Sequence, residues 1–390
     1  MTFTATLRPH QSDAVDALID NNKGQVIVPT GGGKTLIAIF DTYRQLKSDT
    51  PKNILVVAPR ILLANQLCAE FVDHIKNAHV MHVHSGETQY FKTTNPNRIK
   101  LFVDNVEGHK LIFTTYHSLH RVQESGIPVD TIYFDEAHNS VQRHFHTPTA
   151  HFATVGSDRC FFFTATRRTS STPSKPGMNW SDVYGEVIHR VAAPELVDGG
   201  YIVPPKVKVQ KYDVGGGKDI NEDCNHLVDS ITQSEMSKIL VCVKTTRQLT
   251  MLMQTDFPTQ LKEMGYSYLY ITSKTGAVID GKKVDRETFF NTLNEWGKDK
   301  DKRFIVLHRS ILSEGISVNG LECVIFLRNM DIIEMTQSIG RVVRTAPDKS
   351  FGLCIVPVYS KVGIATEKRL QTVVDTVFKE GEMLDSNVTK

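Results

Sequence analysis

The sequence has no apolar segment long enough to cross a lipid bilayer, although 40% of its 390 residues are hydrophobic. Its first residues, MTFTATLRPHQ, lack the basic and then apolar order of a secretory signal. It also has no lipidation signature. These absences argue against a membrane partner. We expect a soluble, intracellular protein, which would be cytoplasmic if the source is a prokaryote or a virus of a prokaryotic host.

Cysteine is scarce as well, and the six cysteines lie far apart in the chain. None of them belongs to a CxxC pair, so their spacing indicates neither a zinc ribbon nor a disulfide framework. We expect most of them to be buried, reduced thiols. They are Cys68, Cys160, Cys224, Cys242, Cys323 and Cys354.

A large excess of positive charge is also missing, because 45 Lys and Arg stand against 43 Asp and Glu. Net charge therefore does not identify a nucleic-acid-binding protein. A local basic groove remains compatible with this balance, since phosphate contacts need only a lined groove and not a basic chain. Evidence for a nucleic-acid partner has to come from motifs.

The sequence does contain a regular alternation of short apolar runs and longer helix-like stretches. Such alternation is typical of a parallel sheet covered by helices. The pattern occurs twice, so we predict two α/β domains. The expected strands are 25–28, 54–58, 110–114, 131–134 and 160–163 in the first domain, and 239–243, 268–271, 304–307, 323–327 and 353–358 in the second.

A segment rich in Ser, Pro and Gly, from Arg167 to Pro205, separates the two sets of runs. This composition favours a loop and linker over a packed strand or helix. We therefore place the domain boundary near Pro204. The predicted domains are residues 1–204 and residues 205–390.

A glycine-rich loop follows the first expected strand and leads into a helical stretch at 36–46. Glycines let successive backbone N–H groups turn toward one anion, a lysine can reach the β- and γ-phosphates, and a threonine hydroxyl can ligate Mg²⁺. Val28 replaces the leading Gly of the pattern GxxxxGK[ST], but the donors come mostly from later residues. The expected nucleotide-binding residues are Thr30, Gly31, Gly32, Gly33, Lys34 and Thr35. A second run, Gly215–Lys218, lacks the following Ser or Thr and is expected to be a turn.

Two adjacent carboxylates, Asp135 and Glu136, follow the expected strand 131–134. Ligand sites of α/β proteins lie at the carboxyl ends of such strands. Asp135 can help to hold Mg²⁺, and Glu136 is then the candidate that orients and polarises an attacking water. The alternative is a pair of acids that only favours a helix N-terminus, and the presence of the phosphate loop makes that reading weak.

The glycine-rich loop together with Asp135-Glu136-Ala137-His138 resembles the superfamily 2 helicases. The resemblance implies two tandem RecA-like domains, with ATP and Mg²⁺ bound in the cleft between them. Leu7-Arg8-Pro9-His10-Gln11 is similar to the adenine-reading element of the branch that contains the type III restriction motor subunits. It implies that Arg8 and Gln11 contact the nucleotide, with Gln11 at the base edge.

Further segments resemble family motifs in the expected order. Residues 58–66 resemble the strand-binding motif Ia, which implies that Pro59 and Arg60 contact nucleic acid, and residues 114–119 imply the same for Thr115. Thr164-Ala165-Thr166 matches motif III. It implies that Thr164 and Thr166, together with His138, couple the ATP site to the nucleic-acid groove.

The second domain carries the remaining motifs. Residues 337–344 match QxxGRxxR, and Gln337, Arg341 and Arg344 are spaced to share one helical face that can point at a γ-phosphate. Residues 310–317 resemble motif V, where Gly315 permits close approach to ATP and Ser317 replaces the usual Asp. Lys244 resembles motif IV and is expected to touch a phosphate backbone.

The histidines invite a metal reading, above all His82 with His84. No cysteine or acidic ligand stands at a recognisable spacing from them, so solvated or hydrogen-bonded histidine is the default. Trp180 and Trp296 are expected in packing rather than in base stacking.

We predict an ATP-hydrolysing helicase or translocase, with DNA favoured over RNA as its track and a specificity-giving partner protein left open. One alternative is a motor that moves along duplex DNA without separating the strands, as the restriction-motor resemblance implies. A second is a P-loop ATPase switch or kinase that acts on protein or a small molecule. That reading leaves the resemblances at 164–166, 310–317 and 337–344 unexplained.

Overall fold

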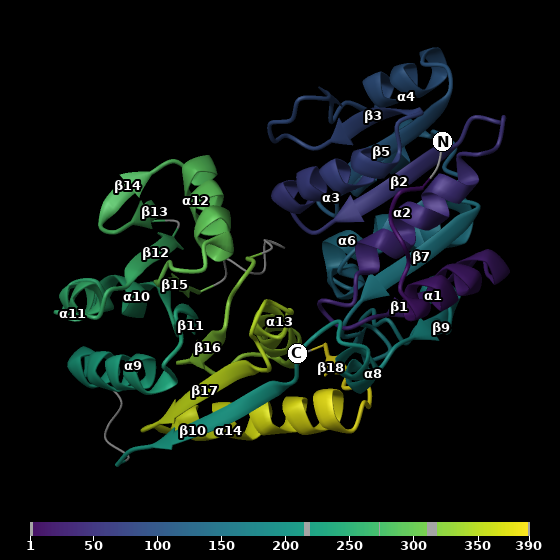
Figure 1. The fold of residues 1–390 in the computed structure, drawn as a ribbon. Coiled ribbons are helices and arrows are strands. Elements are labelled where there is room, and N and C mark those ends of the chain that lie inside the picture. Colours follow the sequence, from purple (N-terminus) through teal and green to yellow (C-terminus); the bar gives the residue numbers. More distant parts are fainter. Residues whose placement is uncertain (1–2, 214–218, 273, 310–317, 389–390) are drawn as a thin grey trace. The chain divides into compact units, whose positions relative to one another are not determined.

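The computed structural model describes residues 3–213, 219–272, 274–309 and 318–388 (Figure 1). The chain divides into two compact units. The first unit contains residues 1–191 together with 385–390, and the second contains residues 192–384. The predicted boundary near Pro204 thus differs from this division, in which the last residues join the first unit.

The first unit is built on an eight-stranded parallel sheet. Its strand order is β4-β3-β5-β2-β6-β7-β1-β9. The strands are β1 (Lys23–Ile27), β2 (Asn53–Ala58), β3 (Ala78–Val83), β4 (Phe91–Lys92), β5 (His109–Thr115), β6 (Thr131–Phe134), β7 (Arg159–Thr164) and β9 (Val187–Arg190).

Helices cover this sheet, and one apolar core lies between it and α4, α5 and α6. That core includes Ile99 of α4, Leu119 of α5 and Phe145 of α6. On α3, Leu67 and Phe71 are buried as well. The helices are α1 (Pro9–Asp20), α2 (Lys34–Gln45), α3 (Ile61–His74), α4 (Pro96–Asn105), α5 (Leu119–Ser125), α6 (Arg143–His151) and α7 (Ser181–Tyr184), with the short turns η1 (Ala137–Asn139) and η2 (Phe152–Gly156).

The register of the central strands brings their carboxyl ends to one edge of the sheet. Ile27 of β1 pairs with Thr164 of β7, and Phe134 of β6 pairs with Phe162 of β7. The segments that follow β1, β6 and β7 therefore leave the sheet side by side. This is the edge at which open parallel sheets bind ligands.

The second unit has its own eight-stranded sheet, in the order β10-β17-β16-β11-β15-β12-β13-β14. Its pairs are parallel from β10 to β12, whereas β13 and β14 extend the sheet as an antiparallel hairpin. The strands are β10 (Pro205–Lys211), β11 (Lys238–Cys242), β12 (Ser267–Thr272), β13 (Gly276–Ile279), β14 (Lys282–Val284), β15 (Phe304–His308), β16 (Cys323–Phe326) and β17 (Gly352–Val358).

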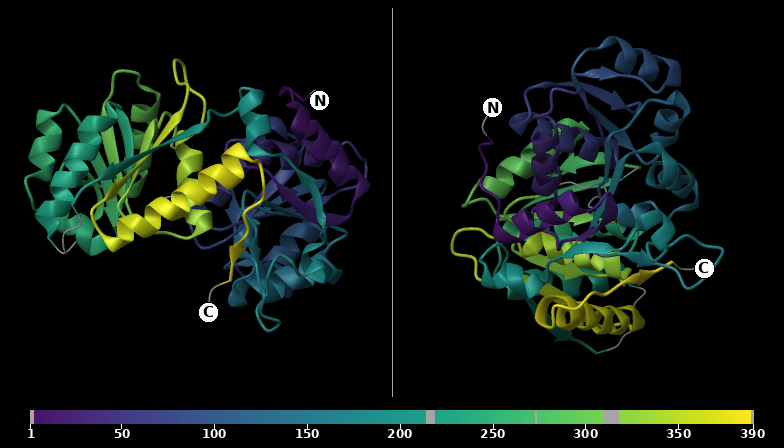
Figure 2. Two further views of the ribbon diagram at one scale, coloured as in Figure 1. Left: turned by 90° about the horizontal axis from the view of Figure 1, so that it is seen from below. Right: turned by 90° about the vertical axis from the view of Figure 1, so that its right-hand side faces the viewer.

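The core of the second unit packs α9, α10 and α11 against β11, β15, β16 and β17. Figure 2 shows α14 lying along β10 and β17. The helices are α8 (Ala193–Asp198), α9 (Ile220–Ser234), α10 (Thr246–Leu252), α11 (Phe257–Glu263), α12 (Arg286–Lys298), α13 (Ile332–Val342) and α14 (Lys361–Val373), followed by the π-helical turn η4 (Val374–Lys379).

The segment 167–205 is more structured than its composition indicates. It contains β9, which pairs with β1 at the edge of the first sheet, and α8 of the second unit. It also contains β8 (Arg168–Thr169), which pairs with the C-terminal strand β18 (Ser386–Asn387). The expectation of a loop and linker was therefore wrong for these residues, because pairing with distant strands provides the hydrogen bonds that local sequence does not reveal.

All six cysteines are free and buried, which confirms that prediction for the thiols. In the part of the chain that the structure describes, no helix is both long and apolar enough to cross a membrane.

Candidate ATP site and motor residues

The phosphate loop lies between β1, which ends at Ile27, and α2, which begins at Lys34. Gly31 and Gly33 adopt left-handed backbone conformations, with φ of 90° and 81°. Residues with a Cβ rarely adopt these angles, so glycine is needed at both points. The loop delivers Lys34 and Thr35 to the N-terminus of α2, where unpaired helical N–H groups and the helix dipole favour an anion.

Side chains at the start of α1 fasten the carbonyl groups of this loop. In a trans peptide the N–H and the carbonyl point in opposite directions. Because the carbonyls of Gly32 and Gly33 accept hydrogen bonds from α1, the N–H groups of Gly33 and Lys34 point away from α1. This is the arrangement that a phosphate cradle needs. The contacts are Arg8 Nη1 to Gly31 O (3.2 Å), His10 Nε2 to Gly32 O (2.7 Å) and Gln11 Nε2 to Gly33 O (3.1 Å).

The carboxylate of Glu136 lies close to the ammonium group of Lys34, at the end of the phosphate loop. The Nζ atom of Lys34 lies 4.0 Å from Oε1 of Glu136, and Glu136 has a left-handed φ of 46°. The backbone beside it is held by Tyr116, whose hydroxyl donates to the carbonyl of Asp135 at 2.9 Å. Two elements that are far apart in sequence thus place a cation and an acid at one site.

Asp135 stands in an unusual electrostatic environment. Burial raises the pKa of its carboxyl group above the ordinary value, and the negative charge of Glu136 raises it further, whereas Lys34 acts in the opposite direction. A nearby cation would stabilise the ionised form. The environment is therefore suited to a site where a positive ion is expected.

A chain of polar contacts connects Glu136 with the segment after β7. The Nδ1 atom of His138 lies 3.5 Å from Oε2 of Glu136 and 3.0 Å from Oγ1 of Thr164. The same threonine oxygen accepts a hydrogen bond from the backbone N–H of Thr166 at 3.2 Å. Of the three residues expected to couple sites, Thr164 therefore contacts both His138 and Thr166.

The residues expected to contact a nucleic-acid strand differ in exposure. Arg60, at the start of α3, and Lys244, which follows β11, are exposed, and Pro59 is half-buried. Thr115 is only 3% exposed. Its side chain thus offers little surface to a strand, and Arg60 and Lys244 are the better placed of the four.

In the second unit, α13 carries Gln337 and Arg341. Arg341 is buried, and Gln337 is half-buried. The helix ends at Val342, so Arg344 lies beyond it and forms a β-bridge with Ile202. The expected helical face therefore includes Gln337 and Arg341 but not Arg344.

The N-terminus of α13 is fixed by polar side chains. The Asp331 side chain caps the helix by accepting from the backbone N–H of Glu334 at 2.7 Å. Both oxygens of Glu334 accept from the guanidinium of Arg328, at 2.9 and 3.0 Å. A second guanidinium, that of Arg309 at the end of β15, lies 3.7 Å from Glu334.

Two expectations fall on residues outside the described part of the chain. Gly315, with the rest of the segment 310–317 that includes Ser317, is one of them. The expected turn at residues 215–218 is the other. Their roles stay predictions.

The histidine pair His82 and His84 makes an internal contact. The Nδ1 atom of His82 lies 2.9 Å from Nε2 of His84, and both rings are buried. Among the described residues, no group of three or more His, Cys, Asp or Glu side chains could hold a metal ion.

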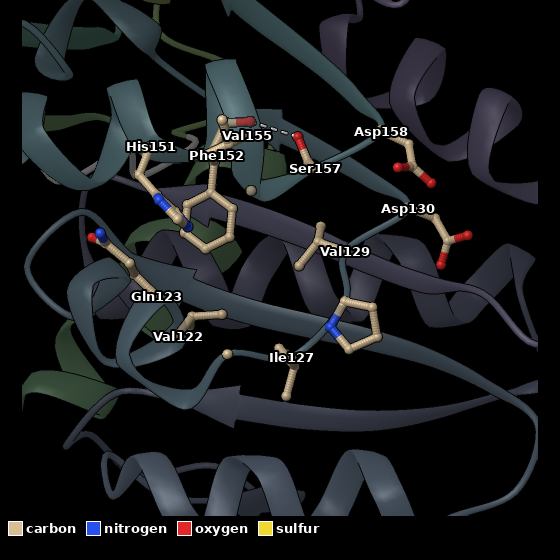
Figure 3. Close-up of a pocket in the computed structure, with 13 residues that line it drawn as sticks. Val122, Gln123, Ile127, Val129, Asp130, His151, Phe152, Val155, Ser157 and Asp158 are labelled. Atoms are coloured by element: carbon tan, nitrogen blue, oxygen red, sulfur yellow. Dashed lines mark hydrogen bonds between the residues drawn. The ribbon is translucent and has the colours of Figure 1, made fainter.

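A pocket of about 470 Å³ lies at the opposite edge of the first sheet, where β6 and β7 begin (Figure 3). It is lined by the end of α5, the turn η2, and the loops that contain Asp130 and Asp158. The phosphate loop and the acid pair follow the other ends of these parallel strands. The pocket is therefore not part of the candidate ATP site.

Sequence reasoning missed two residues of this site. His10 and Tyr116 lie within the motifs at 7–11 and 114–119 and were not predicted to have a role, although each bonds a backbone carbonyl of the site. Their positions beside Gln11 and Thr115 were the available signal.

Comparison with known proteins identifies the family. Residues 4–168 match the family described as Type III restriction enzyme, res subunit, and residues 222–346 match the Helicase conserved C-terminal domain. The chain belongs to the superfamily 2 helicases, in the type III restriction motor branch. Helicase families of this kind are ATP-hydrolysing enzymes. The two sheets of this chain match the two RecA-like domains of superfamily 2 helicases.

Solved structures share the fold of this superfamily 2 chain. The ATP-dependent Type ISP restriction-modification enzyme LlaBIII bound to DNA has a TM-score of 0.78 and 19% identity over 96% of this chain. The structure of a nuclease-deletion mutant of the Type ISP enzyme LlaGI, in complex with a DNA substrate mimic, has a TM-score of 0.69 and 19% sequence identity over 96% of this chain. The Mycobacterium smegmatis helicase Lhr bound to ssDNA and AMP-PNP has a TM-score of 0.60 and 18% sequence identity over 95% of this chain. The chain spans only 30%, 29% and 48% of these proteins.

Proposed function

We propose that this protein is a nucleic-acid-dependent ATPase that works as a helicase or translocase on DNA. The observation that carries the proposal is the contact of Lys34 with Glu136, at 4.0 Å, at the edge where Thr164 also lies. In this geometry one site can hold phosphates and activate water, and His138 connects it to a second motif. A plain phosphate-binding loop needs no such connection.

In the proposed site, ATP is the substrate, and its phosphates lie on the N–H groups of the loop from Thr30 to Thr35. The hydroxyl of Thr35 would supply an oxygen ligand, the type that Mg²⁺ takes, and the carboxylate of Asp135 would help to hold the ion from its second shell. When bound, Mg²⁺ would neutralise charge on the phosphates. Glu136 orients the attacking water, and Arg8 and Gln11 lie on the adenine side.

The second unit supplies the remaining groups of the proposal. Arg341 and Arg344 stabilise charge on the γ-phosphate, Gln337 assists them, and Gly315 lets the backbone approach closely. Such arginines contribute on the order of 10³ to 10⁵ in rate. ATP would bind in the cleft between the two units, and closure and opening of that cleft would drive movement along the strand.

DNA is the proposed track because the fold matches two Type ISP enzymes described in complex with DNA or a DNA mimic. Arg60 and Lys244 are exposed cations that can contact a phosphate backbone. Binding through phosphates is tolerant of sequence and weakens with salt. Specificity would then come from a protein partner or from the shape of the substrate.

Steady-state ATP hydrolysis by wild type and Glu136→Gln tests the proposal. Each is assayed alone and with single-stranded DNA, duplex DNA and RNA. We expect stimulation of wild type by DNA, and a loss of activity in the variant of at least 100-fold, because the amide cannot polarise water. Hydrolysis that none of the three polymers stimulates would instead support an ATPase switch.

The restriction-subunit match favours one second candidate, a motor that moves along duplex DNA without separating strands. A strand-displacement assay and a triplex-displacement assay on the same duplex distinguish the two. Displacement of the triplex strand from a duplex whose strands are cross-linked would identify translocation without unwinding.

A further inference from the structure

About two turns along α2 from Lys34, a buried carboxylate joins several elements. Asp41 lies on α2 and is 0% exposed. The Asp41 network, as we call it, consists of Asp41, Arg44 and Gln45 on α2, Thr131 and Tyr133 on β6, and Arg159 on β7. None of these residues belongs to a motif described above.

Both oxygens of Asp41 are occupied by donors. The guanidinium of Arg159 spans the carboxylate, with Nη1 at 2.9 Å from Oδ2 and Nη2 at 3.2 Å from Oδ1. The hydroxyl of Tyr133 donates to Oδ2, and Nε2 of Gln45 donates to the same oxygen at 3.0 Å. A buried carboxylate is tolerated only when it is paired in this way.

The network connects the elements that carry the candidate site. Asp41 is on the helix that begins with Lys34, and Tyr133 lies two residues before Asp135. Arg159 begins the strand that ends at Thr164. Its Nη2 also donates to the carbonyl of Leu18 on α1, at 2.6 Å. One cluster thus bonds α1, α2, β6 and β7 together.

The geometry of these bonds restricts α2 more strictly than apolar packing does. Asp41 follows Lys34 by seven residues, which is two turns and about 10 Å along the helix, so both lie on one face. Hydrogen bonds are directional, and a two-point guanidinium contact fixes both the rotation and the axial position of the helix. Apolar contacts are non-directional and leave more freedom to slide.

We propose that Asp41, Tyr133 and Arg159 are positioning residues that hold Lys34 and Thr35 in register with the acids that follow β6. The inference rests on the proposed function, since it concerns hydrolysis at that site. Its consequence is kinetic. A shift of α2 by about 1 Å can cost on the order of 10²-fold in rate when the reacting groups are misplaced.

The competing explanation is that the cluster serves only to stabilise the fold. The Asp130 contact provides a matched comparison, because Asp130 also joins β6 to another strand. It accepts from Nζ of Lys52 at 2.7 Å and from the backbone N–H of Asn53 at 2.7 Å. This contact lies at the start of β6, next to Thr131, but its partners Lys52 and Asn53 are not on α2.

The test compares Asp41→Asn, Tyr133→Phe and Asp130→Asn with wild type. Thermal unfolding is recorded for each protein, and kcat and KM for ATP are measured with saturating DNA well below every unfolding midpoint. We expect Asp41→Asn to lose at least 10-fold in kcat and Tyr133→Phe at least 3-fold, with KM within about 3-fold. Asp130→Asn should keep the wild-type kcat, even where its midpoint falls.

Each result has a defined meaning. If Asp41→Asn does not fold, Tyr133→Phe decides, because it removes one hydroxyl and keeps the ion pair. A wild-type kcat in Tyr133→Phe, or a loss in Asp130→Asn equal to that in the network variants, overturns the inference. Absence of ATP hydrolysis in the wild type instead overturns the proposed function.

Discussion

At the scale of single residues, Gly33 shows how the two sides of the phosphate loop constrain one position. A Cβ on Gly33 would lie 2.3 Å from Nε2 of Gln11, and the φ of 81° already disfavours any side chain. The backbone conformation therefore requires glycine here, and a side chain would in addition displace the Gln11 amide that bonds the loop. Gly126, with a φ of 64° and open space around it, has only the first requirement.

We predict that Gly33→Ala abolishes measurable nucleotide binding, because the alanine methyl displaces Gln11 and the loop carbonyl that it holds. Gly126→Ala is the matched control. It should cost about 1 kcal/mol in stability from its left-handed backbone alone and leave nucleotide affinity unchanged. Fluorescent ATP-analogue titration measures affinity, and chemical unfolding measures stability. Equal affinities of the two variants would contradict this view of Gly33.

His82 gives a pH-dependent prediction. Burial, with a smaller effect of His84, lowers the pKa of His82 to about 4, against an ordinary value near 6.5. The unfolded chain therefore binds a proton first as the pH falls. The stability due to neutral His82 is fully present above pH 6.5 and is lost between pH 6.5 and pH 4. A shift of this size corresponds to about 3 kcal/mol.

Replacement of His82 by Gln tests this linkage through urea unfolding from pH 7 to pH 4. We expect the free energy of unfolding of wild type to fall more steeply than that of the variant across this range, so that the gap between them narrows toward pH 4. Parallel curves would show that another group dominates. The comparison cancels the titration of all groups that the two proteins share.

At the scale of elements, the salt bridge at the start of α13 controls how this helix is attached to its sheet. Arg328 is only 5% exposed, and both of its terminal nitrogens donate hydrogen bonds to the carboxylate of Glu334. Loss of the carboxylate leaves a buried cation poorly compensated. Because Glu334 remains partly exposed, solvent reduces the expected cost to about 2 kcal/mol.

We predict that Glu334→Gln lowers the stability of the second unit by this amount and reduces kcat, since α13 also carries Gln337 and Arg341. Asp375→Asn removes an exposed pair with Lys379 in the same unit and serves as the control, with no measurable change expected. Calorimetry resolves the transition, and an ATPase assay follows the kinetic effect. Unchanged unfolding in Glu334→Gln would show that Arg328 finds another partner.

The strands predicted from sequence are those in the centre of each sheet. Strands such as β2, β11 and β17 are buried along their whole length and appear as continuous apolar runs. Edge elements carry no such signal. In β9 every residue is partly exposed, and in β10 only Gln210 is buried, so their pairing depends on partners that are distant in sequence.

The site was predictable to the extent that its residues follow central strands. Lys34, Asp135 and Thr164 stand directly after or close to such strands, which fixes their edge of the sheet. The role of Tyr116 could not be predicted, because it depends on a hydroxyl that follows β5 reaching Asp135 after β6, past the intervening strand β2. The Asp41 network was hidden for the same reason, since its members are up to 118 residues apart.

At the scale of the whole molecule, the chain passes between the two units twice. It leaves the first unit at Val191 and returns at Asp385. After the return, the carboxylate of Asp385 accepts hydrogen bonds from Nε and Nη2 of Arg167, at 3.1 and 2.6 Å. The strand β18 then pairs with β8. A contrast in composition along the sequence cannot reveal a segment that rejoins the earlier unit after some 190 residues.

The start of the second unit gives the last prediction. Residues 192–204 lie before the boundary expected from sequence, yet Leu196 and Ile202 are 1% and 2% exposed. The backbone N–H of Val203 donates to the carbonyl of Val343, at 2.7 Å, just after α13. Each fully buried Leu or Ile contributes about 1.5 to 3 kcal/mol, which is a large share of the 5 to 15 kcal/mol that stabilises a typical domain.

We therefore expect a fragment of residues 192–384 to unfold cooperatively and a fragment of residues 205–384 to unfold at a much lower temperature or without a sharp transition. Circular dichroism during heating measures both, and the shared C-terminus makes them a matched pair. Equal midpoints would mean that α8 and the strand after it belong to the connection and not to the core. A lower midpoint for the fragment 205–384 would show that the second unit begins at Ala192. The segment from Ala192 includes Ile202, which forms the β-bridge with Arg344.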